Sequence, residues 1–521
     1  MSLAQHLPIL PIVLPLFTGA ALLLVNERRV EFKAAISLGA ALALIACATA
    51  LVAAVAGAGP LVYRVGDWPS AFGIVLVADR LSAALVLLAG VLGLAAGWFS
   101  MARWHGAGPR FHALLQFLLM GVNGAFLTGD LFNLFVFFEV LLVASYGLAL
   151  HGAGTARVRA SLHYIAANLL ASLLFLVGAS LIYGTTGTLN MAELSVRIPA
   201  VASADRGLLD AGAALLAVAF LVKAGMWPLS FWLPGTYAAV SPPAAAMFAL
   251  LTKVGVYSVL RTWLLFFVDD GTVEPYGADV LMAGGLVTLA FGAIGVMASQ
   301  NLRRVTAYSL VVSAGTLLAA VAVRDVAVTS AALYYLAAST LGVSAMFLLV
   351  ELLERGRAPG ADILAVTAEA YIEPEEELPQ EAEVGFAIPG SLALLGSAFV
   401  LCAVVLAGLP PLAGFVGKFG LLHALFDLDR LSGAAWSLFA LLIVSGFAAI
   451  VALARAGVRR FWVGDAQVVS VRVVEIAPVF LLIGLCVAMT VGAGSVMEYL
   501  RAAAESLHAP AEYVRGVVHT R

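Results

Sequence analysis

Long runs of apolar residues, separated by short polar stretches, repeat along the whole chain. Each run is continuously apolar and about 20 residues long, the length that an α-helix needs to cross a hydrocarbon layer of roughly 30 Å. Fourteen runs occur, and they centre on residues 6–25, 32–57, 75–99, 111–128, 130–150, 161–183, 209–233, 240–267, 279–298, 302–323, 329–353, 391–426, 433–455 and 476–495. Strands of a membrane barrel would alternate in polarity instead. The pattern predicts an all-α polytopic membrane protein with about fourteen transmembrane helices.

The composition agrees with this class and excludes several others. Of the 521 residues, 63% are hydrophobic and 11% are charged, unlike an ordinary soluble domain. The three cysteines, Cys47, Cys402 and Cys486, lie in separate apolar runs without metal-ligand spacing. We therefore expect no disulfide, no metal site and no other cofactor. The net charge of −3 gives no basis for a nucleic-acid partner, and the expected surroundings are a lipid bilayer.

Lysine and arginine are distributed unevenly between the two sides of the predicted bundle. With the N-terminus outside, the inner loops hold fifteen basic residues and the outer loops hold five, which are Arg64, Arg197, Arg206, Arg324 and Arg430. Inner loops of membrane proteins are enriched in basic residues, so this asymmetry favours an outside N-terminus in a bacterial inner membrane. The first run lacks a basic n-region and an evident cleavage site, and we expect a retained helix.

Proline and glycine interrupt two of the predicted helices at membrane depth. The seventh continues into LVKAGMWPLSFWLPG and the twelfth contains AGLPPLAGFVGKFGLL, and such residues break the helical hydrogen-bond ladder. Lys223 precedes Pro228, whereas Lys418 follows Pro411, as expected if one copy runs through the membrane in reverse. Paired interruptions in two halves of a chain indicate an ion pathway. The alternative is a coincidence of two kinked helices.

These features predict two inverted five-helix repeats. The fourth to eighth helices form the first repeat, at residues 111–267, and the ninth to thirteenth form the second, at 279–455. Residues 1–110 hold three preceding helices, and residues 476–521 hold the last helix and a tail. A cytoplasmic loop at 355–383 has seven glutamates in its second half and is expected to be partly disordered or docked on a partner.

Few ionisable side chains lie deep within the predicted membrane helices. Asp79, Glu139, Lys223, Lys253 and Lys418 are the main ones, and the last four lie near the midplane. A charge at the bilayer centre costs at least about 2.5–3.5 kcal/mol, so each group must face protein or water rather than lipid. Glu139 lies nine residues beyond Asp130, which places it roughly 13 Å deep, near the midplane.

Together these four groups are candidates for a proton pathway. Lys223 is the natural partner of Glu139, because a nearby ammonium stabilises a buried carboxylate. Lys253 and Lys418 extend the row, and lysine suits it because, unlike arginine, it can release its proton when buried. The alternative is a static ion pair of Glu139 and Lys223 that locks two helices, which leaves the other two lysines unexplained.

Three further residues are weaker candidates for extending this path. His163 lies near the start of the sixth helix, and His423 lies about one turn beyond Lys418. A histidine near a helix end is also compatible with a purely structural role. Asp79 lies near a helix start, where a carboxylate favours the helix dipole, so functional and structural roles remain equally open.

Three stretches together resemble a known family: GDLFNLFVFFEVLLVASYGLALHG, LVKAGMWPLSFWLPGTYAAVSPPAAAMFALLTKVGVYSVLR and GLPPLAGFVGKFGLL. They are similar to the antiporter-like membrane subunits of respiratory complex I, membrane-bound hydrogenases and Mrp multisubunit Na⁺/H⁺ antiporters, and most of all to the Mrp D subunit. The resemblance implies fourteen helices in two inverted repeats, with helices seven and twelve broken. It also implies that Glu139 and Lys223 form a charge pair, that Lys253 links two half-channels and that Lys418 connects to the far side.

The eleventh helix departs from this family. Many relatives carry histidine and lysine there, where this chain has Ala338 and Val343. If the resemblance holds, the central relay is interrupted at this point or is filled by water or Thr340. The acidic loop at 355–383 is also longer than the family pattern.

The leading expectation is a proton-translocating subunit of a multisubunit Na⁺/H⁺ antiporter, which works with other membrane subunits and is not an enzyme. The first alternative is a pumping, non-redox subunit of an NADH-quinone oxidoreductase or a membrane-bound hydrogenase. The second is a scaffold that recruits a soluble partner through the loop at 355–383.

Overall fold

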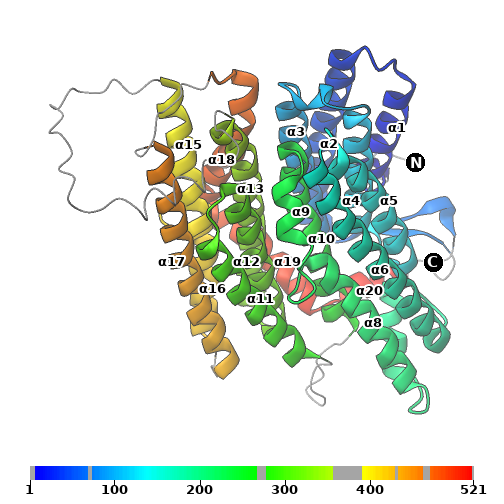
Figure 1. Ribbon diagram of the computed structural model, residues 1–521. Coiled ribbons are helices and arrows are strands. Elements are labelled where there is room, and N and C mark those ends of the chain that lie inside the picture. The colour runs from blue at the N-terminus through cyan, green and yellow to red at the C-terminus, as the bar shows by residue number, and fades with distance from the viewer. Residues whose placement is uncertain are drawn as a thin grey trace, which may run out of the picture.

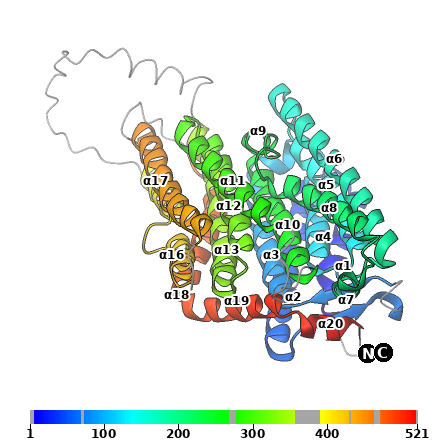
Figure 2. The ribbon, with the colours of Figure 1, turned by 90° about the horizontal axis from the view of Figure 1, so that it is seen from below.

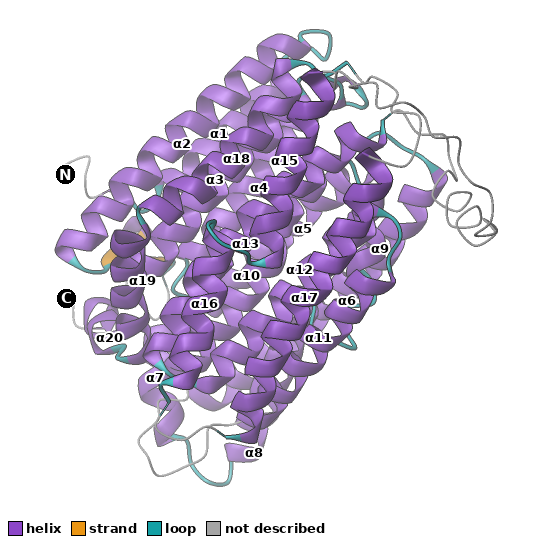
Figure 3. Ribbon diagram, turned by 90° about the vertical axis from the view of Figure 1, so that its left-hand side faces the viewer, coloured by secondary structure: helices purple, strands orange, loops and turns teal. Residues whose placement is uncertain are grey.

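The computed structural model describes residues 6–68, 73–266, 277–355, 390–428, 432–461 and 470–518. The predicted acidic loop lies outside these residues from position 356 onward. Within the described parts the chain is almost entirely helical, with one two-stranded sheet (Figure 3). Twelve of the described helices are long and apolar enough to span a membrane, and three shorter apolar helices accompany them. The prediction of an all-α membrane protein is confirmed.

Each predicted membrane segment corresponds to one helix or to a pair of helices. The first eight correspond to α1 (Leu10–Leu24), α2 (Val30–Ala58), α3 (Arg80–Ser100), α4 (Phe111–Leu127), α5 (Leu131–Leu150), α6 (Thr155–Thr186), α8 (Arg206–Ala224) with α9 (Leu233–Ala239), and α10 (Pro242–Phe266). The last six correspond to α11 (Ala278–Ala298), α12 (Leu302–Val323), α13 (Val326–Glu354), α15 (Gly390–Ala407) with α16 (Ala413–Phe426), α17 (Gly433–Phe461) and α18 (Val473–Val491). Three further helices are α7 (Met191–Arg197), α19 (Ala493–His508) and α20 (Ala511–Val518).

The segment predicted to be helical from residue 75 begins instead as a strand. β2 (Val75–Ala78) pairs antiparallel with β1 (Leu61–Arg64), and all four residues of β2 are buried. A run of four apolar residues fits a buried strand as well as a helix, and only the partner strand decides between them. Helix α3 begins after Asp79, whose carboxylate accepts a hydrogen bond from the backbone of Ser82 as an N-cap.

Both predicted helix interruptions are present. Helix α8 ends at Ala224, where Gly225 takes a φ of 76°, and α9 begins at Leu233. Helix α15 ends at Ala407, where Gly408 takes a φ of 77°, and α16 follows. A positive φ costs glycine little, so these two glycines end the first half of each broken helix.

The centre of the bundle is built from helices that are buried on all sides. Every residue of α10 is buried, and so are 94% of the residues in the apolar stretch of α13. Figure 1 places α10 in the middle of the molecule, and it packs against α8 on one side and α13 on the other. Helix α6 by contrast exposes Leu162, Leu169 and Leu173, as expected of a helix that faces lipid. Charged groups on the central helices are therefore kept away from lipid.

The loops gather at two opposite ends of the bundle. One end, which we call the basic face, carries the loops at 25–29, 101–110 and 151–154 and the start of α12. At this end Arg303 pairs with Glu351 at 2.8 Å and with Glu354 at 2.6 Å. The other end, the hairpin face, carries β1 and β2 together with α19 and α20, which cross it (Figure 2). Arg64 of β1 donates a hydrogen bond to Val517 of α20 there. Loops predicted to share one side of the membrane thus lie together.

Candidate functional site

Glu139 of α5 lies close enough to Lys223 of α8 to act on it electrostatically, and the adjacent Phe138 contacts the lysine. Lys223 is the penultimate residue of α8 and is buried, with its Nζ 4.7 Å from the centroid of the Phe138 ring. Neither Glu139 Oε1 nor Lys223 Nζ has a hydrogen-bond partner among the described residues. The carboxylate acts on the ammonium through space, and the C-terminal end of α8 adds the negative end of its helix dipole. The geometry is that of two neighbouring ionisable groups without a direct hydrogen bond.

Lys253 lies in the middle of α10 and is completely buried. Its Nζ donates a hydrogen bond of 2.6 Å to Ser313 Oγ of α12, and Ser313 Oγ lies 2.9 Å from Ser339 Oγ of α13. The Tyr335 hydroxyl, one helical turn before Ser339, lies near the Thr316 and Ser313 hydroxyls of α12. A hydroxyl both donates and accepts, so this cluster can pass a proton between neighbours.

Lys418 reaches back across the second helix interruption. Its Nζ donates to the carbonyl oxygen of Ala407 at 2.9 Å and lies 3.4 Å from that of Leu406, at the C-terminal end of α15. Those carbonyls lack partners within their own helix, because the chain leaves the helix at Gly408. Lys223 and Lys418 therefore both lie at the C-terminal end of the first half of a broken helix.

Close glycine contacts bring these helices together. A Cβ on Gly255 of α10 would lie 2.7 Å from the carbonyl carbon of Lys223, so the two backbones touch at this point. A Cβ on Gly417 of α16 would lie 2.9 Å from the Cα of Tyr335 on α13. Contacts thus link α5 to α8, α8 to α10, α10 to α12, α12 to α13 and α13 to α16. Glu139, Lys223, Lys253 and Lys418 lie along this series of contacts.

The remaining predicted residues lie apart from this row or bond elsewhere. His163 is exposed, and its Nδ1 lies 3.0 Å from the Arg159 carbonyl oxygen. His423 is exposed, and its Nδ1 lies 3.0 Å from Asp427. The Thr340 hydroxyl donates to the carbonyl of Leu336 in its own helix at 2.6 Å. The hydroxyl that accepts a hydrogen bond from Lys253 is instead that of Ser313.

Asp79 takes part in a separate buried ion pair at the hairpin face. Its Oδ2 lies 2.6 Å from Arg261 Nη2 of α10, and both side chains are buried. The Arg261 guanidinium also lies 5.2 Å from the ring of Tyr513 in α20 and 5.4 Å from that of Tyr257. Arg261 was missed from sequence, although an arginine within an apolar run is a usable signal. Ser313 and Ser339 were also missed, because a serine in a membrane helix usually bonds its own backbone.

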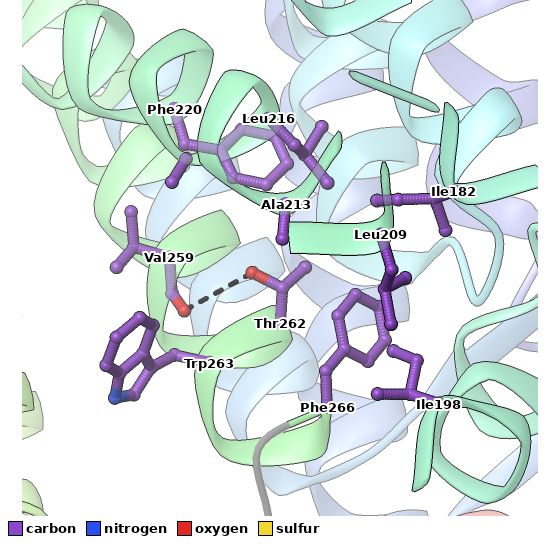
Figure 4. Close-up of a pocket in the computed structure, with 11 residues that line it drawn as sticks. Ile182, Ile198, Leu209, Ala213, Leu216, Phe220, Val259, Thr262, Trp263 and Phe266 are labelled. Atoms are coloured by element: carbon purple, nitrogen blue, oxygen red, sulfur yellow. Dashed lines mark hydrogen bonds between the residues drawn. The ribbon is translucent and has the colours of Figure 1, made fainter. Parts of the chain in front are cut away.

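An apolar cavity lies beside this row, between α6, α8 and α10 (Figure 4). It measures about 50 Å³ and is lined by side chains such as Ile182, Phe220 and Phe266. Its hydroxyl group, on Thr262, donates to the backbone of its own helix. No ionisable side chain lines it, so this cavity offers nothing to hold an ion.

Comparisons with known families and with solved structures define the class of protein. Residues 128–444 match the family described as the transmembrane region of NADH:quinone oxidoreductase and Mrp antiporters. The fold is similar to a chain of the Mrp complex from Dietzia sp. DQ12-45-1b, with a TM-score of 0.85 and 26% identity over 99% of this chain and 100% of that one. It is also similar in fold to a chain of respiratory complex I from Thermus thermophilus, with a TM-score of 0.76 and 22% identity over 96% and 99% of the two chains. The chain is an antiporter-like membrane subunit.

Comparison with curated relatives narrows this class. The chain is 53% identical to the D subunit of a probable K⁺/H⁺ antiporter from Rhizobium meliloti, over 97% of this chain and 96% of the relative. It is 35% identical to the D subunit of a Na⁺/H⁺ antiporter from Bacillus subtilis, over 98% and 99% of the two chains. The chain therefore belongs to the D-subunit family of Mrp antiporters. It is a multi-pass protein of a bacterial membrane and a transporter component rather than an enzyme, as predicted.

Proposed function

We propose that this chain conducts protons within a multisubunit monovalent cation/proton antiporter. One observation carries the proposal: four ionisable groups, Glu139, Lys223, Lys253 and Lys418, lie along one continuous series of helix contacts through the buried centre. A static pair would involve two of these groups only. Buried ionisable side chains in a membrane bundle are costly and are retained where they carry charge or protons.

The proposed route runs from Glu139 and Lys223 to Lys253, then through the hydroxyls of Ser313, Ser339 and Tyr335 toward Lys418. Ser339 of this hydroxyl cluster directly follows Ala338, one of the two positions where the family pattern has histidine and lysine. Water completes the steps that no side-chain contact spans, for example between Lys223 and Lys253. We propose that the two broken segments belong to two inverted five-helix repeats, at residues 111–267 and 279–455.

The partner ion is a monovalent cation, and its movement is coupled to this route in an assembly with other membrane subunits. The name of the Rhizobium relative includes K⁺ and that of the Bacillus relative includes Na⁺. The greater identity to the former, 53% against 35%, makes K⁺ the first ion to test and Na⁺ the second. We propose an inner-membrane location with the N-terminus outside, as the basic loops favour.

The test is antiport in everted membrane vesicles that contain the assembled complex. Glu139→Ala and Lys223→Ala should each lower the proton flux driven by added K⁺ or Na⁺ by about tenfold or more, since each removes a step of the route. Glu505→Ala is a matched control, because Glu505 lies on α19 and pairs only with Arg501 in the described structure. Wild-type flux in both variants, with the complex assembled, would refute the proposal.

A further inference from the structure

A cavity at the basic face is lined by Glu27, Lys33, His105, Arg110 and His112 among apolar side chains. It measures about 330 Å³ and is enclosed by the end of α1, the start of α2, the loop at 104–110 and the start of α4. One water molecule needs only about 10–15 Å³ of a cavity volume measured in this way. The cavity therefore has room for a small polyatomic ion and some water.

Two helix N-termini meet at this cavity, and neither has a side-chain cap. Helix α4 follows Arg110, and its first residues, Phe111, His112 and Ala113, all line the cavity. Helix α2 follows Arg29 and also lacks a side-chain cap, and Val30 lines the cavity. The free N–H groups of a first helical turn and the positive end of the helix dipole both favour an anion.

His112 gives a second and independent indication of a ligand. This side chain lines the cavity and is only 3% exposed, yet neither of its ring nitrogens has a hydrogen-bond partner among the described residues. His105 stands beside it, with ring centroids 5.9 Å apart, and its buried Nδ1 also has no partner in the described structure. The titratable groups that act on His112 are His105, Lys33 and His151, all of them basic. A buried polar group without a partner is expensive, so an acceptor is expected here.

Two carboxylates reduce the net positive charge around this cavity. Glu27 lines it and pairs with Lys33 at 2.9 Å, and the largely exposed Glu31 lies 3.7 Å from His105 Nε2. Arg110 is exposed at the cavity rim, and no ion pair between it and either glutamate occurs in the described structure. The donors of Arg110, His112 and the first turn of α4 are thus left for a ligand.

From these observations we infer that the cavity binds a tetrahedral oxyanion of the phosphate class, at the membrane surface of the basic face. The source of this group is either a free phosphate ion or the headgroup of an anionic phospholipid. Both present the same oxygen acceptors to Arg110, His112 and the helix N-termini. Lys33 joins them when Glu27 is neutralised.

The test uses the purified complex that contains the full chain. Binding of radiolabelled inorganic phosphate is measured by equilibrium dialysis, and retention of lipid is measured by native mass spectrometry after transfer from nanodiscs of phosphatidylcholine alone or mixed with phosphatidylglycerol. Arg110→Gln should weaken binding of the retained ligand about tenfold, because it removes a charge-assisted contact. Arg28→Gln is the matched control, since Arg28 is exposed on the same face but outside the cavity.

A variant with the opposite sign keeps the inference falsifiable if Arg110→Gln fails to assemble. Glu27→Gln should tighten binding several-fold, because it releases Lys33 from its ion pair and removes a negative charge. Binding of phosphate alone identifies a free-ion site, and selective retention of phosphatidylglycerol identifies a lipid site. Absence of both, or equal binding by wild type, Arg110→Gln and Glu27→Gln, overturns the inference.

Discussion

The three membrane-buried lysines of the proposed route are stabilised in three different ways. Lys223 lies over the Phe138 ring near Glu139, Lys253 donates to a serine, and Lys418 donates to the free carbonyls of a helix end. Each arrangement offsets part of the cost of burying an ammonium group. None supplies a fixed carboxylate partner at hydrogen-bonding distance, so each lysine keeps the ability to lose its proton.

The hydroxyl of Ser313 provides a test at the residue scale. Ser313→Ala leaves Lys253 without its described hydrogen-bond partner and should lower proton flux in vesicles about tenfold, the effect of losing one bond to a charged group. Ser309→Ala is the control, because Ser309 lies one turn earlier on α12 and bonds its own backbone. Equal flux in the two variants would exclude Ser313 from the route.

The ion pair of Asp79 and Arg261 gives a second test at this scale. Asp79→Ala leaves a buried guanidinium unpaired, which should lower the free energy of unfolding by about 3–5 kcal/mol. The double variant Asp79→Ala with Arg261→Met should recover most of this loss, because no buried charge remains. Thermal unfolding of the detergent-solubilised complex measures both, and a double variant no more stable than the single one would contradict the account.

At the scale of elements, the two helix breaks place lysines at equivalent helix ends from opposite directions. Lys223 precedes the first break and remains in α8, whereas Lys418 follows the second break and folds back onto the end of α15. A shared position at the negative end of a half-helix explains why one lysine comes before its break and the other after.

The close contact at Gly255 tests how helices align this row. Gly255→Ala places a methyl group 2.7 Å from the backbone of Lys223, so α8 and α10 must separate and the apparent melting temperature and proton flux should both fall. Gly184→Ala, on α6, meets no atom within 4 Å and should be neutral or stabilising, by up to about 1 kcal/mol from helix propensity. Thermal unfolding and vesicle flux are compared for the pair. If Gly255→Ala changed neither the melting temperature nor the proton flux, this contact would not determine the alignment of the ionisable groups.

At the scale of the whole molecule, the two ends of the bundle differ in character. The basic face carries ion pairs between its arginines and the end of α13, and it also holds the proposed oxyanion cavity. The hairpin face is crossed by α19 and α20, which are tied to the bundle by Arg64, by Tyr499 and by the hydrogen bond of His508 to Thr329. Burial lowers the pKa of His508, which favours its neutral form at this contact.

The orientation of these two ends is testable by labelling. On a background with Cys47 replaced by serine, Ala202→Cys at the hairpin face should react with a membrane-impermeant maleimide in intact cells. Ala107→Cys at the basic face should react only after the membrane is opened, because basic loops remain inside. Both positions are exposed in the structure. The reverse pattern would contradict the proposed outside N-terminus.

The sequence by itself determined the kind and approximate number of membrane helices, the two breaks and the four ionisable groups within those helices. These follow from local chemistry: apolar length, proline and glycine at depth, and the cost of a charge in hydrocarbon. Only the tertiary structure decided that residues 75–78 form a strand, that Arg261 pairs with Asp79 and that Ser313 rather than Thr340 meets Lys253. These contacts join residues far apart in the chain, and a hydroxyl or a short apolar run has no fixed partner until the helices pack around it.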